Sequence, residues 1–118
     1  MSELRVTTIS DTAGTGPVTL TKQSAAKAWC NFNGIGTIAA RDSFNVASLT
    51  DNSIGNYNIN LTNSMSNTSY CWSGINNNFH NATSTVVTTS SYNLQSYNSS
   101  HASVDVDLFN SATHGDLA

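Results

Sequence analysis

The chain has 118 residues and a formal net charge of −3, enough for one domain with a single modest hydrophobic core. All four basic side chains lie in residues 1–41 and no charged side chain lies between Asn52 and Val104 when the histidines are neutral, which excludes a phosphate-backbone partner. No segment approaches the roughly 20 consecutive apolar residues of a membrane span, and the N-terminus lacks the apolar stretch of a secretion signal. We therefore expect no nucleic-acid partner and no membrane partner, and synthesis in a cytoplasm.

The first 27 residues have the character of an arm that has too few apolar residues to fold on itself. Leu4–Ile9 predicts a short strand, with Leu4 and Val6 on one face, and a polar, turn-rich stretch follows it. Leu20–Ala28 is either a two-turn helix, too short to be stable alone, or an extended segment. We expect residues 1–27 to form a docking arm and residues 28–118 to form the folded domain.

The remainder of the chain consists of short runs with period-two alternation, rich in Val, Ile, Thr, Tyr and Phe and separated by Asn, Gly, Asp and Ser. Asn33-Gly34 is a strong hairpin signal. The predicted strands are Trp29–Asn33, Gly36–Ala40, Ser43–Thr50, Asn56–Thr62, Ser69–Ser73, Ser84–Ser90, Tyr92–Tyr97 and Ala102–Phe109. This spacing predicts an all-β fold, an antiparallel β-sandwich or a jelly-roll-like barrel, with the arm extended from its N-terminal end.

Two carboxylates, Asp105 and Asp107, are the only acidic pair at a spacing that places both on one face of a strand. A general acid and base pair and a calcium site are the functional interpretations. The interpretation favoured here is a solvated or edge-strand face, where acidic side chains discourage pairing with another sheet.

The remaining residues of chemical interest do not form a recognisable set. His80, His101 and His114 are scattered, and Cys30 and Cys71 lack the spacing of a zinc site, so both cysteines are interpreted as small buried apolar residues. No nucleophile-elbow motif is present. We expect no cofactor, no metal and no enzymatic activity.

Aromatic side chains surrounded by Asn and Ser have two interpretations. Rings combined with amides are typical of adaptable binding surfaces, and a carbohydrate suits such a surface. The same rings can instead fill a core that is short of aliphatic residues, which is the interpretation favoured here. The candidate glycan contacts are Tyr70, Trp72, Tyr92 and Tyr97, with Phe79 in the same region.

Three runs of residues give the chain a specific resemblance. AKAW-x-NFNG occupies Ala26–Gly34, a G-T-I-A-x-R-D-S-F-N-V run occupies Gly36–Val46, and T-D-N-x-x-G-x-Y-x-x-N occupies Thr50–Asn60. In combination they resemble a module of short tail-fibre-type and other virion proteins of tailed bacteriophages. The lead-in Leu4–Gly14 and the closing Val104–Asn110 are also similar, so the resemblance covers about half of the chain.

The resemblance implies a virion structural protein, a homotrimer docked to the particle by its arm, with the β-domain facing outward. A short tail fibre or fibre tip that contacts a host surface glycan is the first expectation, and a capsid decoration protein is the alternative, because the chain contains no rod-forming repeat. A free carbohydrate-binding module is the third. The partners implied are further copies of the chain and other tail or capsid proteins. The candidate assembly residues of the arm are Leu4, Arg5, Val6, Ile9, Lys22 and Lys27.

Overall fold

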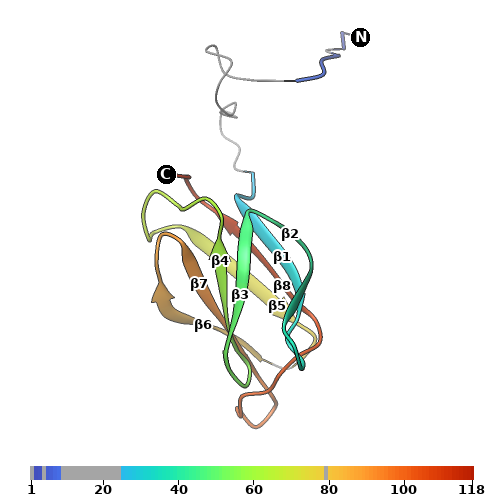
Figure 1. Ribbon diagram of the computed structural model, residues 1–118, viewed down its shortest axis with the longest axis vertical. Coiled ribbons are helices and arrows are strands. Elements are labelled where there is room, and N and C mark those ends of the chain that lie inside the picture. The colour runs from blue at the N-terminus through green and yellow to red at the C-terminus, as the bar shows by residue number, and fades with distance from the viewer. Residues whose placement is uncertain (1, 4, 9–24, 79) are drawn as a thin grey trace.

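The computed structural model describes residues 2–3, 5–8, 25–78 and 80–118. These residues form a sandwich of two four-stranded antiparallel sheets (Figure 1), which confirms the predicted all-β class. The strands are β1 (Ala28–Asn33), β2 (Ala39–Phe44), β3 (Val46–Ser53), β4 (Asn56–Leu61), β5 (Cys71–Asn76), β6 (His80–Val87), β7 (Ser91–Tyr97) and β8 (Phe109–His114). The order is β2-β1-β8-β5 in one sheet, sheet A, and β3-β4-β7-β6 in the other, sheet B. Among the described residues no helix is long and apolar enough to cross a membrane.

The core lies between the two sheets and is built mainly from aromatic rings. Phe32 of β1 stacks on Phe109 of β8 with ring centroids 5.4 Å apart, and Tyr57 of β4 meets Phe32 edge-on at 5.3 Å. These three rings are fully buried, as are Ile59 and Tyr92. Stacked and edge-on pairs stabilise a core beyond the area that they bury, which offsets the shortage of aliphatic residues.

The strand β4 follows its sequence pattern closely. Tyr57, Ile59 and Leu61 are buried while the asparagines between them are half-buried on the outer face. The strand pairs antiparallel with β3. The Asn33-Gly34 signal also marks a real hairpin, although its loop extends to Ile38 and β2 begins at Ala39 instead of Gly36.

The single strand predicted at Ser43–Thr50 is wrong, because Asn45 divides it. Asn45 has a φ of 55°, a left-handed conformation that asparagine tolerates better than most residues. Before it β2 belongs to sheet A, and after it β3 belongs to sheet B. The chain therefore changes sheets at Asn45, and Phe44 and Val46 do not share the face that a continuous strand would have given them.

The final strand predicted at Ala102–Phe109 is also wrong, because β8 begins where that strand was expected to end. In residues 104–108 each backbone hydrogen bond goes to a different segment: Val104 N donates to Ser96 O and Val106 O accepts from Gly34 N. An alternating sequence gives a strand only where one neighbouring strand accepts all its bonds. Here the alternating residues instead contact separate segments of the chain.

The arm predictions are only partly within the described residues. Residues 5–8 form no strand, and residues 25–27 form no helix, while Ala28 already belongs to β1. Every described residue from 2 to 8 is exposed to solvent.

Candidate assembly surface on the open side of the sandwich

The sandwich has an open side where β2 and β3 diverge from Asn45. The Asn45 amide fixes this corner: its Nδ2 donates to Lys27 O at 3.0 Å and to Asn63 O at 3.2 Å, and its Oδ1 accepts from Asn63 N at 2.8 Å. One side chain thus joins the start of β1, the β2–β3 corner and the segment after β4. The arm therefore enters the sandwich at one end of the gap between β2 and β3.

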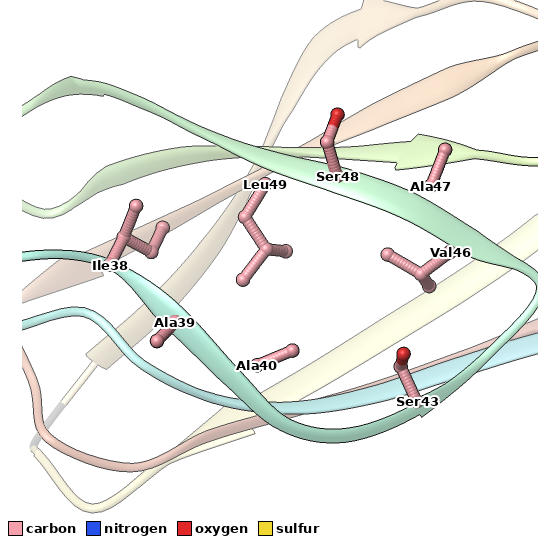
Figure 2. Close-up of a pocket in the computed structure, with 8 residues that line it drawn as sticks. All are labelled: Ile38, Ala39, Ala40, Ser43, Val46, Ala47, Ser48 and Leu49. Carbon is pink, nitrogen blue, oxygen red and sulfur yellow. The ribbon is translucent and has the colours of Figure 1, made fainter.

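A groove lined by uncharged side chains, both aliphatic and serine, fills this gap. In Figure 2, Val46 and Leu49 on β3 point toward Ala40 and Ser43 on β2 across the space between the strands. The groove has a volume of about 240 Å³, and the residues that line it carry no charge. Its lining is Ile38, Ala39, Ala40, Ser43, Val46, Ala47, Ser48 and Leu49. Alanines form much of the wall, so the groove has room for side chains from elsewhere.

Both strands beside the groove are edge strands. Among the described strands, β2 is hydrogen-bonded to β1 only and β3 to β4 only. A free strand edge presents unpaired N–H and C=O groups that another strand can bind. The groove therefore combines an uncharged wall with two rows of backbone hydrogen-bonding groups.

An exposed aromatic pair lies beside this open side, on the outer face of sheet A. Trp29 of β1 and Phe44 of β2 are direct cross-strand partners, with solvent-exposed fractions of 38% and 54%. Ala112 of β8 is the partner of Trp29 on its other side. Cross-strand partners share a face, so these residues form a continuous apolar row across three strands. An exposed apolar row next to an uncharged groove is typical of an interaction surface.

Sequence reasoning missed Trp29 and Phe44 as surface residues. For Trp29 a signal existed, because alternation places it with Asn31 and Asn33 and opposite Cys30 and Phe32. For Phe44 the signal was hidden by the corner at Asn45, which the sequence pattern did not indicate.

The outer face of sheet B differs, because its amides are bonded to one another. Asn93, 4% exposed, donates from Nδ2 to Asn56 Oδ1, Asn58 Oδ1 and Tyr57 O at 2.6, 2.7 and 3.1 Å. Asn60 Nδ2 is 3.0 Å from two hydroxyls of β3. Most donors on this face are already used within the sheet, so the open side of the sandwich is the stronger candidate for binding.

The described residues of the predicted arm differ in their contacts with the sandwich. Arg5 Nε lies 3.0 Å from Glu3 Oε1 in a solvent-exposed ion pair, and Val6 is 52% exposed. Lys27, by contrast, is fixed to the sandwich, since its N donates to Thr113 O at 2.8 Å. The predicted arm residues Leu4, Ile9 and Lys22 lie outside the described residues.

The predicted aromatic glycan contacts are wrong for two of the four residues. Tyr92 is fully buried with its hydroxyl 2.8 Å from Ser111 Oγ, and Tyr70, 5% exposed, donates to Thr88 O and Ser91 O. Burial raises the pKa of both phenols, that of Tyr70 to about 12. These two rings fill the core, as the favoured interpretation expected.

The other two candidate glycan contacts are half-buried. The Trp72 ring lies 5.7 Å from the Tyr70 ring with its Nε1 buried and without a hydrogen-bond acceptor, and the Tyr97 hydroxyl bonds to Gln95. Phe79 lies outside the described residues.

The two carboxylates of the predicted acidic pair have separate roles and no common strand. Asp105 Oδ1 accepts from Gly55 N at 2.7 Å and from the Tyr57 hydroxyl at 2.9 Å, so the expectation of a solvated face is wrong for this residue. Asp107 is exposed and bonds to Asn77. Burial and the hydrogen bond to Asp105 raise the pKa of Tyr57. Asp105 is thus an internal acceptor that holds the β3–β4 turn against the segment before β8.

The histidines and cysteines form no ligand set in the described part of the chain. No group of three metal-binding side chains is present there, and His80 and His101 are exposed, with rings stacked 4.7 Å apart. Cys30 is buried as predicted, and burial raises its pKa to about 11. The same prediction is wrong for Cys71, which is exposed on the outer face of β5. Both thiols are free.

Comparison of the chain with models of protein families, with curated proteins and with solved structures found no match.

Proposed function

We propose that the protein is a structural component of a tailed bacteriophage virion, a homotrimeric short tail fibre or fibre tip docked to the particle by its N-terminal arm. The observation that carries the proposal is the exposed arm. All of its described residues from 2 to 8 face solvent, including the apolar Val6. An exposed apolar arm gains stability when a larger assembly covers it. The resemblance of the Ala26–Asn60 runs to phage virion proteins supplies the kind of assembly.

The open side of the sandwich supports self-association. Two free strand edges, an uncharged groove and the exposed pair of Trp29 and Phe44 lie together there. Oligomers of identical chains close by rotational symmetry, and a threefold ring is one such arrangement. Trp72 and Tyr97 would contact a host glycan, since Tyr70 and Tyr92 are buried.

A capsid decoration protein is the second candidate. The observation in its favour is the single sandwich of residues 25–118, which contains no rod-forming repeat. Such a protein would cover the head in many copies, and the arm would clamp neighbouring capsid subunits. The two candidates share the same structure and differ in their location on the particle.

Imaging of purified particles tests the proposal. A tag fused to Ala118, which is exposed, would be located by labelled antibody and electron microscopy. Label confined to the tail supports the fibre, and label over the whole head replaces it with the decoration protein. The control uses particles assembled in the presence of the tagged chain that lacks residues 1–20. This truncated chain should not be incorporated, so these particles should show no label. No label on any particle overturns both candidates in favour of a free binding module.

A further inference from the structure

We propose that Leu4–Ile9 of one copy binds as an added β-strand in the groove between β2 and β3 of a second copy. The inference rests on the self-association in the proposed function, and it names the segment and the surface that carry out that association. Residues 10–27 of the arm would remain for contact with the particle.

The acceptor has the features that strand addition requires. In this mode of binding the edge backbone supplies hydrogen bonds and pockets receive alternate side chains. Here β2 and β3 supply two free edges, and the groove between them measures about 240 Å³. A cavity of roughly 150 Å³ is sufficient to hold benzene, so this groove can accept more than one apolar side chain. The small side chain of Ala40 on the β2 wall leaves that room open (Figure 2).

The donor has a matching pattern. Leu4 and Val6 lie on one face of an extended Leu4–Ile9, and the segment contains Val, Ile and Thr, which favour strands. In the single chain Val6 is 52% exposed, and residues 5–8 are exposed without forming a strand. The segment therefore has an apolar face and backbone groups that the single chain does not bury.

The charges around the two partners are complementary. The arm carries Glu3 and Arg5, and the exposed part of β2 carries Arg41 and Asp42. The Glu3–Arg5 ion pair is fully exposed, and such a pair contributes little to stability. Both arm charges can therefore exchange their present partner for an opposite charge on β2 at small cost.

The length of the arm and its exposure point to a second copy. The 18 residues 10–27 separate Ile9 from β1, and an extended chain of that length reaches about 60 Å. This length is enough for the segment to reach a neighbouring chain. The described arm residues are exposed in the single chain, so a neighbouring copy can receive them.

Disulfide trapping between two differently tagged full-length chains tests the placement directly. Both chains carry Cys71→Ser to remove the exposed thiol. One chain carries Val6→Cys, and the other carries Ala40→Cys or Val46→Cys, one for each wall of the groove (Figure 2). The control partner carries Ser73→Cys, an exposed position on the outer face of β5. We expect at least one groove position to cross-link ten times faster than Ser73→Cys, and equal rates at all three positions would overturn the proposal.

The same cysteine substitutions distinguish binding of the arm to a second copy from folding of the arm back onto its own chain. A single chain that carries Val6→Cys together with the faster groove cysteine should form disulfide-linked oligomers. Formation of a disulfide-closed monomer instead would overturn the assignment to a second copy.

A charge substitution on the arm tests the face that inserts. Val6→Asp should weaken self-association at least tenfold in sedimentation equilibrium, because it places a carboxylate in an uncharged groove. Thr7→Asp adds the same charge on the opposite face and should change the association by less than threefold. Equal effects of the two substitutions would overturn the proposal.

Failure of this inference and failure of the proposed function give different results. A chain that is trimeric, and whose association is unaffected by Val6→Asp, overturns the arm exchange and leaves the virion proposal intact. A wild-type chain that remains monomeric at high concentration overturns the arm exchange together with the trimer.

Discussion

The two faces of β1 use aromatic residues in opposite ways. On the inner face Phe32 has no exposed surface and contacts the rings of Tyr57 and Phe109, whereas on the outer face Trp29 is 38% exposed beside Phe44. The inner rings have their partners within the chain. The outer rings are cross-strand neighbours of each other but stay exposed to solvent. The inner rings thus complete a core within the chain, whereas the outer rings belong to the surface for which we propose a partner.

The strongest test of this difference removes one ring from each face of sheet A. Phe109→Ala deletes a fully buried ring and should lower the free energy of unfolding by about 4 kcal/mol. Phe44→Ala removes a ring that is 54% exposed and should lower it by less than about 1 kcal/mol. Urea denaturation followed by tryptophan fluorescence measures both values. Similar losses for the two variants would mean that the outer face belongs to the core.

Two glycines with similar backbone conformations allow a crowded part of the sandwich to be compared with an open one. Gly55 and Gly36 have similar positive φ values, 65° and 67°. A Cβ at Gly55 would lie 2.6 Å from Ser96 O and 2.7 Å from Val104 O, whereas a Cβ at Gly36 would meet nothing within 4 Å.

Gly36→Ala therefore measures backbone strain alone, about 1 kcal/mol, and Gly55→Ala adds the clash with backbone oxygens, for a total of about 3 kcal/mol. Thermal unfolding by circular dichroism distinguishes them. Equal losses would show that the segment near Val104 moves aside freely.

The acidic pair provides the next contrast. Asp105→Ala would leave Gly55 N without its acceptor and the Tyr57 hydroxyl with only its longer hydrogen bond to Gly34 O at 3.2 Å, which should cost about 2 kcal/mol of unfolding free energy. Asp107→Ala removes an exposed carboxylate and should cost less than about 0.5 kcal/mol. Chemical denaturation at pH 7 gives both numbers. A larger loss from Asp107 would contradict the assignment of the internal acceptor to Asp105.

Sequence reasoning succeeded where a strand has one buried face and one neighbour on each side. The alternation of Tyr57, Ile59 and Leu61 predicted β4 and its buried face, because a period of two matches a half-buried strand directly. It failed at Asn45 and in residues 104–108. The outcome there depends on distant partners, namely Lys27 and Asn63 for the corner and Gly34 and Ser96 for the later segment.

The candidate site could be predicted only in part for the same reason. The arm could be recognised from its composition, because few apolar residues and many turn-forming residues are local properties. The groove could not, since it exists only because the chain changes sheets at Asn45 and separates β2 from β3. Tyr70 and Tyr92 were ambiguous, because an aromatic ring among asparagines and serines has the same sequence signature in a core and on a surface.

The smallest expected effect concerns the two cysteines, one buried and one exposed, at alkaline pH. Burial raises the pKa of Cys30 from 9.0 to about 11, so the folded state favours the neutral thiol. This contribution to stability is complete below pH 9 and is lost as the pH rises toward 11. At pH 10 the loss should be about 1 kcal/mol relative to pH 8.

Cys30→Ala should abolish that part of the pH dependence, although it lowers stability at every pH by removing a buried sulfur. Cys71→Ala, which removes the exposed thiol, is the matched control variant. The comparison of variants is needed because the tyrosines also ionise in the unfolded chain near pH 10. Identical pH profiles for wild type and Cys30→Ala between pH 8 and 10 would show that water reaches Cys30, and thus that the inner face of β1 is less closed than the buried ring of Phe32 indicates.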